Sequence, residues 1–381
     1  MADDGMAVGK DGGNKKKVRM YLDGCFDLVH YGHANACRQA KQLGDHLIVG
    51  LHPDHLISEN KGPPVYNEQE RCKIARAIKW VDEVYENAPY MNPISLLDSI
   101  GADFLVHGDD LSFTADGRDT HEHLRQAGRF KNFKRTSFIS TTDLVGRILL
   151  MTQTHHGLAS QRESSPVTSS DADLKKLKTF QKNNDVPVTA NLIQSFSTGR
   201  RPEPEDKIVY APGNYDLLHI GHVNFLEAAS KEGGYLLVGL YHDCVIQEKK
   251  GLNFPIMGLL ERALNLLSLR YVSDVLIGAP EYLTPEFLKT NKISLVVRGD
   301  ANIGSSVSKI GAADPLEEAK KMGIFKMLES GSSVRTKDII WRIVTHRPLY
   351  ERRNAEKQRK EEAAQNILKK RMEVSSETGY I

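Results

Sequence analysis

Two copies of one short motif constrain the fold of this chain more than any other feature of its sequence. The first copy, His30-Tyr31-Gly32-His33, follows an apolar run at residues 19–22 and opens a helix-forming stretch. The second copy, His219-Ile220-Gly221-His222, lies 189 positions later in the same setting. A strand, a glycine turn and a helix start together present unpaired N–H groups and a partial positive charge, and the imidazoles add further donors. Each copy therefore predicts a phosphate-binding site.

The repetition extends well beyond the motif. Residues 47–51 and 236–240 share the pattern Leu-x-Val-Gly-Leu, and Glu70-Arg71 is matched by Glu261-Arg262. Further pairs of segments follow in the same order: 80–84 with 271–275, 107–109 with 298–300, and 141–148 with 336–343. The offset grows from 189 to 195, as small loop insertions would make it. Similarity over this many segments indicates a duplicated domain.

Strands and helices alternate along both halves. In the first half we expect strands at residues 19–22, 46–51, 80–84 and 103–110, with helices between them. This alternation predicts an α/β fold: two tandem Rossmann-like domains, each a parallel sheet flanked by helices, related by a pseudo-two-fold axis. Ligands bind such sheets at the carboxyl ends of the strands. The residues that we expect in loops of that kind are His30, His33, Lys61, His107 and Thr141.

Composition shifts divide the chain into five segments. The expected segments are a disordered tail at 1–17, a first domain at 18–150, a linker at 151–206 with a short helix near 174–180, a second domain at 207–346, and a charged, exposed helix with a tail at 347–381. The linker is Ser-rich near residues 164–170 and broken by prolines near 199–205.

The overall composition excludes several classes of partner. The net charge of +2 is too small to indicate nucleic acid. No apolar run approaches the roughly 20 residues that cross a bilayer. The four cysteines (Cys25, Cys37, Cys72 and Cys244) form no Cys-x-x-Cys pair and are typical of reduced thiols. We therefore expect a cytosolic protein without a transmembrane segment, and leave peripheral attachment to the endoplasmic reticulum open.

The first motif, together with residues 134–142, resembles the cytidylyltransferase family of nucleotidyltransferases. The second signature of that family is close to Arg-Thr-x-Gly-Ile-Ser-Thr-Ser/Thr, and here it stands at residues 135–142 with Phe138 in place of the usual glycine. Residues 61–64 and 80–84 also match. The resemblance covers about residues 18–150 and 207–346. Two tandem domains resemble the members that act on phosphoethanolamine, whereas members that act on phosphocholine have one domain followed by a long amphipathic helix.

The resemblance implies a reaction between CTP and phosphoethanolamine that gives CDP-ethanolamine and pyrophosphate, in phosphatidylethanolamine biosynthesis. The attack on the α-phosphorus is direct and in line, without a covalent intermediate, so positioning and electrostatics supply the catalysis. Mg²⁺ is expected to enter with CTP, with no dedicated metal site on the protein. One-domain relatives dimerise, so the resemblance implies that the two domains pair within the chain, with a homodimer as an open alternative.

The resemblance also assigns site residues. The expected catalytic residues are His30, His33, Lys61, Arg135 and Thr141. The expected CTP-binding residues of the first domain are Asp23, Gly24, Cys25, Phe26, Gly32, Lys79, His107, Gly108, Asp109, Ser140 and Thr142. Those of the second domain are Ala211, Pro212, His219, Ile220, Gly221, His222, Lys250, Arg298, Gly299, Asp300, Ala301, Ser332, Ser333, Val334, Arg335 and Thr336.

Each assignment has a structural alternative. The histidines could be structural groups at a helix start, Lys61 and Lys79 could be solvated lysines, and Ser140 could be a helix cap. His107 and Asp109 could belong to a polar loop. Asp27 is expected to hold the first turn by bonds to the backbone. Asp23, Trp80 and Tyr90 are unranked candidates for recognising the amine.

Three functional alternatives stay open. The chain could be a cytidylyltransferase for phosphocholine or glycerol phosphate, or an adenylyltransferase. It could be a non-catalytic nucleotide-binding regulator, or a scaffold that docks through its charged C-terminal helix. The second signature has decayed to Ser330-Gly331-Ser332-Ser333-Val334-Arg335-Thr336 in the second half. Because the reaction needs every group at once, we expect catalysis in the first domain and a binding, regulatory or structural role for the second.

Overall fold

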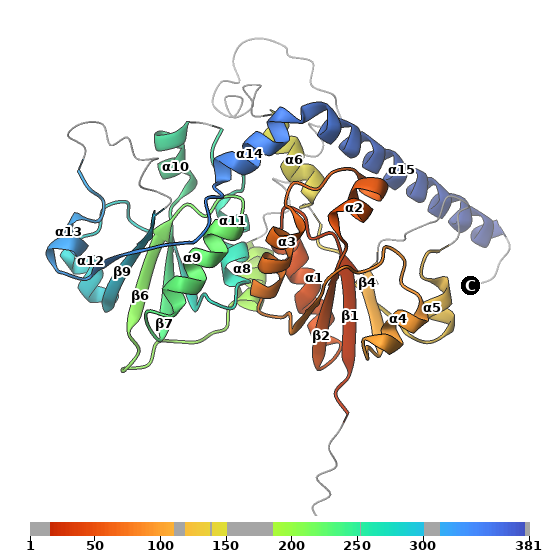
Figure 1. Cartoon of the computed structure of the whole chain (residues 1–381), viewed down its shortest axis with the longest axis horizontal. Coiled ribbons are helices and arrows are strands. Elements are labelled where there is room, and N and C mark those ends of the chain that lie inside the picture. The colour runs from red at the N-terminus through yellow and green to blue at the C-terminus, as the bar shows by residue number, and fades with distance from the viewer. Residues whose placement is uncertain are drawn as a thin grey trace, which may run out of the picture.

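The computed structural model describes residues 16–109, 119–137, 139–150, 186–251, 253–300 and 313–377. In this part of the chain, two five-stranded parallel sheets stand side by side with helices against their faces (Figure 1). The strand order is β3-β2-β1-β4-β5 in the first half and β8-β7-β6-β9-β10 in the second, so the two topologies are the same. The predicted pair of Rossmann-like domains is confirmed.

The elements follow the same order in both halves. Those of the first half are β1 (Arg19–Gly24), α1 (Tyr31–Gln42), β2 (His46–Leu51), α2 (Asp54–Lys61), α3 (Glu68–Ala77), β3 (Glu83–Tyr85), α4 (Ile94–Ser99), β4 (Phe104–Gly108), α5 (Glu122–Gln126), β5 (Phe130–Phe133) and α6 (Thr141–Leu150). Those that follow are α8 (Val186–Phe196), β6 (Ile208–Gly213), α9 (Ile220–Ser230), β7 (Tyr235–Leu240), α10 (Asp243–Lys250), α11 (Leu259–Leu267), β8 (Asp274–Ile277), α12 (Pro285–Thr290), β9 (Ile293–Gly299), α13 (Glu317–Lys321), β10 (Phe325–Leu328), α14 (Thr336–Thr345) and α15 (Arg347–Glu377).

The central strand of each sheet fixes where a ligand can bind. β1 pairs with β2 on one side and with β4 on the other, and its residues Met20 and Tyr21 are fully buried. The chain runs outward from β1 to β3, then crosses back over β1 to continue with β4. The loop after β1 therefore lies at the point where the strand order reverses, which is the usual ligand crevice of an open α/β sheet. The first histidine motif occupies this loop.

Two segments differ from the expectations. Residues 186–196, inside the expected linker, form helix α8, because Phe196 is fully buried with its ring 5.1 Å from that of Trp80. The strand expected at 80–84 begins only at Glu83, since the Lys79 N–H donates to the Ser268 carbonyl oxygen in the second half and Trp80 packs against Phe196 of α8. The tail expected at 1–17 lies outside the described residues up to residue 15, as does the helix near 174–180.

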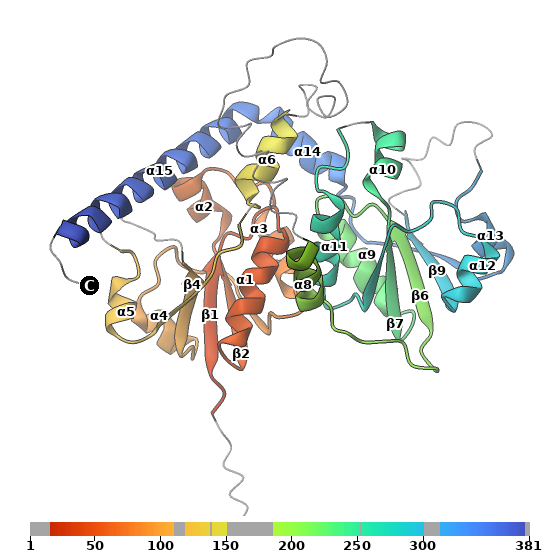
Figure 2. The ribbon, with the colours of Figure 1, turned by 180° about the vertical axis from the view of Figure 1, so that it is seen from behind.

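The C-terminal helix α15 is largely exposed over its described side chains, as its charged composition predicts, but its base packs against the first half. It crosses the first half of the molecule beside α2 and α6, although it follows the last helix of the second half (Figures 1 and 2). Tyr350 is only 4% exposed, and its hydroxyl donates to the Pro64 carbonyl oxygen at 3.3 Å. A helix with few apolar residues is thus held by polar contacts at its base.

The two halves contact each other reciprocally. Arg147 on α6 donates two parallel bonds to the Glu261 carboxylate on α11 at 2.7 and 2.9 Å. Arg342 on α14 does the same to Glu70 on α3 at 2.7 and 2.8 Å. Between them, Ile78 and Leu269 form an antiparallel bridge. Self-complementary contact of this kind is typical of a two-fold interface between identical subunits.

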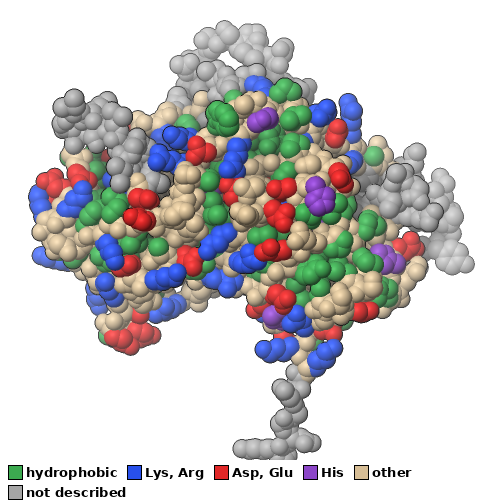
Figure 3. Space-filling view, in the orientation of Figure 1, with side chains coloured by type: hydrophobic (Ala, Val, Ile, Leu, Met, Phe, Trp, Pro, Cys, Tyr) green, Lys and Arg blue, Asp and Glu red, His purple; other side chains and the backbone are tan. Residues whose placement is uncertain are grey.

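Charged side chains of both signs are interspersed over the face shown in the space-filling view (Figure 3). This distribution accords with the small net charge of the chain. Of the described helices, none has both the length and the apolar character needed to cross a lipid bilayer.

Candidate active site

A strained loop places the first histidine pair. Between β1 and α1, Phe26 and Leu28 adopt positive φ angles of 49° and 47°, a conformation that costs non-glycine residues about 1–3 kcal/mol each. Asp27 between them is 1% exposed, and its Oδ1 accepts the backbone N–H groups of Val65 and Tyr66 at 3.0 and 2.9 Å. Asp27 therefore fastens the strained turn to the loop before α3, which is the structural role expected of it.

The hydrogen bonds of the two imidazoles define which ring nitrogen faces a ligand. His30 caps helix α1, and its Nδ1 accepts the Gly32 N–H at 3.1 Å. His33 Nδ1 accepts the His30 N–H at 3.4 Å, and the ring centroids are 4.0 Å apart. An imidazole that accepts at Nδ1 carries its proton on Nε2 when it is neutral. Both rings can thus donate from Nε2.

Burial keeps both histidines neutral. It lowers the pKa of His30 well below its usual range, and that of His33 to about 3. Positive charges on Lys357 and Arg135 lower both pKa values further, and Lys61 adds to the effect on His33. A pair of neutral donors surrounded by cations is suited to an anionic ligand such as a polyphosphate.

Gly32 leaves room for close approach to the helix start. A Cβ at this position would lie 2.8 Å from the His30 ring and 3.1 Å from the Ile139 side chain. Any larger residue would therefore displace the histidine. Phe26 packs on the other side of the pair, with its ring 5.2 Å from that of His33.

The second signature lies against the first. Thr141, at the first position of α6, donates from Oγ1 to the Asp27 carbonyl oxygen at 2.8 Å. Thr136 accepts a bond from the buried Asn35 on α1 at 2.9 Å. Asp109 at the end of β4 accepts the Arg135 N–H at 2.8 Å. The N-termini of α1 and α6 are thus brought together, and both can supply N–H groups to one anion.

Ser140 and Thr142 flank Thr141 in different roles. Ser140 Oγ accepts the Asp143 N–H at 3.1 Å and donates to the Asp143 carboxylate at 2.6 Å, which is the cap foreseen as the structural alternative. Thr142 Oγ1 accepts a bond from Lys357 at 3.0 Å.

Asp23 and Lys61 lie at the same edge of the sheet. Burial raises the pKa of Asp23, but hydrogen bonds from His52 and Asn92 outweigh it and lower the value to about 2. The pKa of Lys61 is raised, chiefly by the neighbouring Cys25. Burial alone would lower it, but Tyr90 and Asp23 also raise it. The Lys61 ammonium lies 5.8 Å from the centre of the Tyr90 ring. This part of the site combines a cation, a carboxylate and an aromatic ring.

His107 ends β4, and its ring lies 4.8 Å from that of His121. The remaining expected residues of the first half lie at the ends of the same two strands: Gly24 ends β1, Cys25 follows it, and Gly108 ends β4.

Lys79 and Trp80 lie away from this cluster. They follow α3, which begins beside the site and runs to the opposite edge of the sheet. The Lys79 ammonium donates to the Phe196 carbonyl oxygen and stands 4.8 Å from the centre of the Trp80 ring. Burial lowers the pKa of Lys79 to about 8. Both residues therefore belong to the contact between the halves rather than to a CTP or amine site.

The second half repeats the scaffold of the first. Tyr215 and Leu217 have φ angles of 49° and 52°, and Asp216 accepts the N–H groups of Ile256 and Met257 at 2.8 and 3.0 Å. The rings of His219 and His222 are 3.8 Å apart. The scaffold that holds the histidine pair has thus been retained.

The hydrogen bonds of the second pair differ from those of the first. Nδ1 of His219 and Nδ1 of His222 are buried without a hydrogen-bond partner among the described residues. His219 Nε2 lies 3.5 Å from the hydroxyl of Thr336, which itself donates to the Asp216 carbonyl oxygen at 3.0 Å. Because the Thr336 hydroxyl donates its own proton to Asp216, its oxygen can only accept from His219 Nε2–H, whereas no described hydrogen bond fixes the tautomer of His222.

The other expected residues of the second half fall at matching places. These are the end of β6 (Ala211, Pro212), the start of α9 (Ile220, Gly221), the end of α10 (Lys250), the end of β9 and the residue after it (Arg298, Gly299, Asp300), and the loop before α14 (Ser332, Ser333, Val334, Arg335). Ala301 lies outside the described residues. Asp300 accepts the Ser330 N–H at 3.1 Å, as Asp109 does for Arg135.

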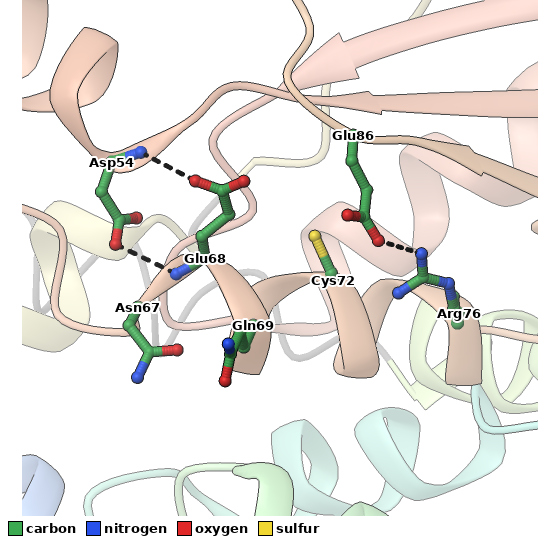
Figure 4. Close-up of a pocket in the computed structure, with 7 residues that line it drawn as sticks. All are labelled: Asp54, Asn67, Glu68, Gln69, Cys72, Arg76 and Glu86. Carbon is green, nitrogen blue, oxygen red and sulfur yellow. Dashed lines mark hydrogen bonds and ion pairs between the residues drawn. The ribbon is translucent and has the colours of Figure 1, made fainter.

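A separate hollow lies along α3 (Figure 4). Its polar walls pair with one another: the Asp54 and Glu68 side chains exchange bonds with each other's backbone N–H at 3.1 and 3.4 Å, and Arg76 pairs with Glu86. It contains neither histidine of the first pair. Because its charges are already compensated, we assign no ligand to it.

The sequence analysis missed the contribution of α15. Arg353 donates to the Asp27 carboxylate at 2.9 Å, across 326 positions of the chain. Arg353, Lys357 and Lys360 all contact the first half and are spaced four and three residues apart. This spacing puts them on one face of a helix, and it is the signal in the sequence that could have identified them.

No group of three His, Cys, Asp or Glu side chains converges in the described parts of the chain in a way that could hold a metal ion.

Comparison with known proteins agrees with this geometry. The family model described as cytidylyltransferase-like matches residues 21–147 and again 210–341. An ethanolamine-phosphate cytidylyltransferase of Dictyostelium discoideum is 46% identical over 350 residues, which cover 91% of this chain and 96% of the relative. The enzyme of the same name from Mus musculus is 43% identical over 92% of both chains.

A choline-phosphate cytidylyltransferase of Arabidopsis thaliana matches far less of the chain. It is 39% identical over 146 residues, which are 37% of this chain and 48% of the relative. The tandem arrangement is therefore shared with the ethanolamine-phosphate relatives along nearly their whole length. The chain belongs to the ethanolamine-phosphate cytidylyltransferases, a family of proteins with two cytidylyltransferase-like domains.

Proposed function

We propose that this protein transfers CMP from CTP to phosphoethanolamine, giving CDP-ethanolamine and pyrophosphate. The observation that carries the proposal is the first histidine pair beside the starts of α1 and α6, whose Nδ1 atoms accept backbone N–H groups and so leave Nε2 of each ring as the donor. The names of the relatives supply the choice of substrates.

The proposed reaction is one in-line displacement. A phosphate oxygen of phosphoethanolamine forms a bond to the α-phosphorus of CTP, and the bond from that phosphorus to the bridging oxygen of pyrophosphate breaks. The leaving pyrophosphate gains negative charge, which Nε2–H donors of His30 and His33 and the cations Lys61 and Arg135 would stabilise. The N–H groups at the start of α6, beside Thr141, would hold a phosphate in line.

We propose that Mg²⁺ arrives bound to CTP. Mg²⁺ prefers phosphate and water oxygens to an all-protein cage. The proposed role is to neutralise charge on the triphosphate. The chain's own part is to orient the two anions and donate to them.

We propose that the second half supports the first half without turning over substrate. The decayed signature and the absence of a described hydrogen bond to Nδ1 of His219 and of His222 support this role. The reciprocal contacts of Arg147 and Arg342 further support a pairing of the two halves in place of the dimer of one-domain relatives. Gel filtration with light scattering would separate a monomeric chain from a homodimer.

We propose the cytosol as the site of the enzyme, which the four free cysteines support. Flotation with vesicles of endoplasmic reticulum lipids would test peripheral attachment. A protein that stays in the soluble fraction does not bind these lipids by itself.

Turnover by the purified chain tests the main proposal. CTP and phosphoethanolamine should yield pyrophosphate and CDP-ethanolamine, with phosphocholine, glycerol phosphate and ATP as matched alternatives. If the chain prefers phosphocholine, the proposed acceptor substrate is wrong. If it prefers ATP, the proposed nucleotide is wrong. If no phosphorylated alcohol or amine yields pyrophosphate while CTP still binds, a nucleotide-binding regulator takes the place of the enzyme.

A further inference from the structure

The helix α15 reaches the first active site from the far end of the chain. It follows α14 of the second half, yet Arg353 donates at 2.9 Å both to the buried carboxylate of Asp27 and to the Pro63 carbonyl oxygen. The Arg353 side chain is 12% exposed. A charged pair that is this well buried fixes the helix to the turn that holds His30.

One helical turn further on, α15 contacts the second signature. Lys357 donates from Nζ to Thr142 Oγ1 at 3.0 Å, and Asn354 donates to the Thr142 carbonyl oxygen at 3.3 Å. Thr142 stands in the first turn of α6, next to the Thr141 hydroxyl that contacts the histidine loop. The ammonium of Lys357 thus lies where the two signatures meet.

The charge of Lys357 acts on the same two imidazoles as that of Arg135. Both lower the pKa values of His30 and His33, and Lys61 adds to the effect on His33. Arg147 lowers the pKa of His30 as well, so four cations act on the pair. Of the carboxylates near the site, Asp27 is paired with Arg353, Asp143 accepts from Ser140, and Asp23 accepts from Asn92 through one of its two oxygens.

We propose that Lys357 binds a phosphate group of the substrates in the first-half site, with Arg353 as the residue that positions it. The inference rests on the proposed function of that site. It extends the active site to a helix outside both regions that the family model matches, 21–147 and 210–341. In the second half, Lys337 takes the place of Thr142 and is exposed, so the arrangement is particular to the first half.

The test compares Lys357→Ala with Arg359→Ala. Arg359 lies on the same helix, is exposed, and loses the same charge on substitution. We expect Lys357→Ala to lose about 10- to 100-fold in kcat/KM, as for one hydrogen bond to a charged group. Arg359→Ala should stay within about twofold of the parent chain. A rise in KM for CTP would assign the triphosphate to Lys357, and a rise in KM for phosphoethanolamine would assign the phosphomonoester.

Two further measurements separate the possible failures. CTP binding without the second substrate is measured for the parent and both variants. If the parent binds CTP but does not turn over, the proposed function fails, while weaker CTP binding by Lys357→Ala alone still supports the inference. If Lys357→Ala matches Arg359→Ala in both binding and turnover, the inference is overturned. A thermal unfolding midpoint lowered in step with activity would assign Lys357 a structural role and also overturn it.

Discussion

The two histidine pairs of this molecule have the same backbone but different hydrogen bonds. In each half, a strand ends in a turn with two positive φ angles and a buried aspartate that accepts two N–H groups. In the first half, both Nδ1 atoms accept backbone N–H groups, whereas both Nδ1 atoms of the second half are buried without a partner among the described residues. The difference shows that a duplicated scaffold can be kept while the backbone bonds that orient the imidazoles are lost.

The surroundings of the two pairs differ as well. Asp27 of the first half shares its second carboxylate oxygen with Arg353, while the two carboxylate oxygens of Asp216 accept only backbone N–H groups among the described contacts. Burial accordingly raises the pKa of Asp216. The first site is therefore set apart by a cationic helix as well as by its hydrogen bonds.

The largest expected difference between the halves is in turnover. His33→Ala should lower kcat by about 10²- to 10³-fold, because it removes a donor to the developing charge. His222→Ala should stay within about tenfold, the scale of an indirect effect of about 1 kcal/mol. Steady-state release of pyrophosphate measures both. Equal losses in the two variants would show that the second site is catalytic or coupled, contrary to the comparison.

In contrast to turnover, the stabilising effect of the ion pairs between the halves should be equal in the two halves. Glu70→Gln and Glu261→Gln should each lower the free energy of unfolding by about 2–3 kcal/mol, because each leaves a partly buried guanidinium without its carboxylate. Chemical denaturation measures this.

The matched control for the ion pairs is Glu86→Gln. Glu86 pairs with Arg76, but both side chains are almost half exposed, at 45% and 49%. An exposed pair contributes at most about 1 kcal/mol. A clear inequality between Glu70→Gln and Glu261→Gln would argue that the two contacts are not energetically equivalent.

The buried histidines should make stability fall as the pH falls. Burial lowers the pKa of His33 and of His222 to about 3, whereas the unfolded chain titrates near its usual value. Between about pH 6.5 and 3 the unfolded state binds more protons, so each histidine removes stability as acid is added, about 1–2 kcal/mol by pH 5. Denaturation at a series of pH values measures the slope. His33→Gln and His222→Gln should each flatten it by the same amount, and a slope that neither variant changes would contradict the burial of neutral rings.

The smallest expected effect concerns the threonines that start α6 and α14. Thr141 and Thr336 donate to the Asp27 and Asp216 carbonyl oxygens at 2.8 and 3.0 Å. Replacement by valine should cost about 1 kcal/mol in either half, since one hydrogen bond is lost. Denaturation of the two variants side by side measures the difference. A markedly larger cost for Thr336→Val would mean that its contact with His219 contributes to stability.

Local patterns predicted the scaffold of both sites. The strands around Met20 and Leu47, the histidine turns and the helix starts are all local patterns of apolar residues, glycine and caps. β5 escaped prediction, because Phe130–Phe133 is a four-residue strand with two polar positions. α8 escaped too, since only the burial of Phe196 against the first half distinguishes it from a linker.

Local sequence patterns could not predict which residues distant in the chain lie together in the fold. Lys79 follows a helix of 10 residues, which spans about 15 Å and carries the chain from the active-site edge to the opposite edge. The resemblance that placed Lys79 among the CTP-binding residues did not indicate this displacement. The pairing of Asp27 with Arg353 depends on where α15 lies, and the charge pattern of α15 alone fixes only which side chains share a face.

The position of α15 also sets an order of events during synthesis. The turn that holds His30 is made early, but its buried Asp27 meets its guanidinium only after residue 353 has been added. Domains usually fold from the N-terminus as the chain emerges. Until residue 353 has been added, the buried Asp27 in the turn of the first site therefore lacks its guanidinium partner. The complete first site therefore forms only after translation has passed through both domains.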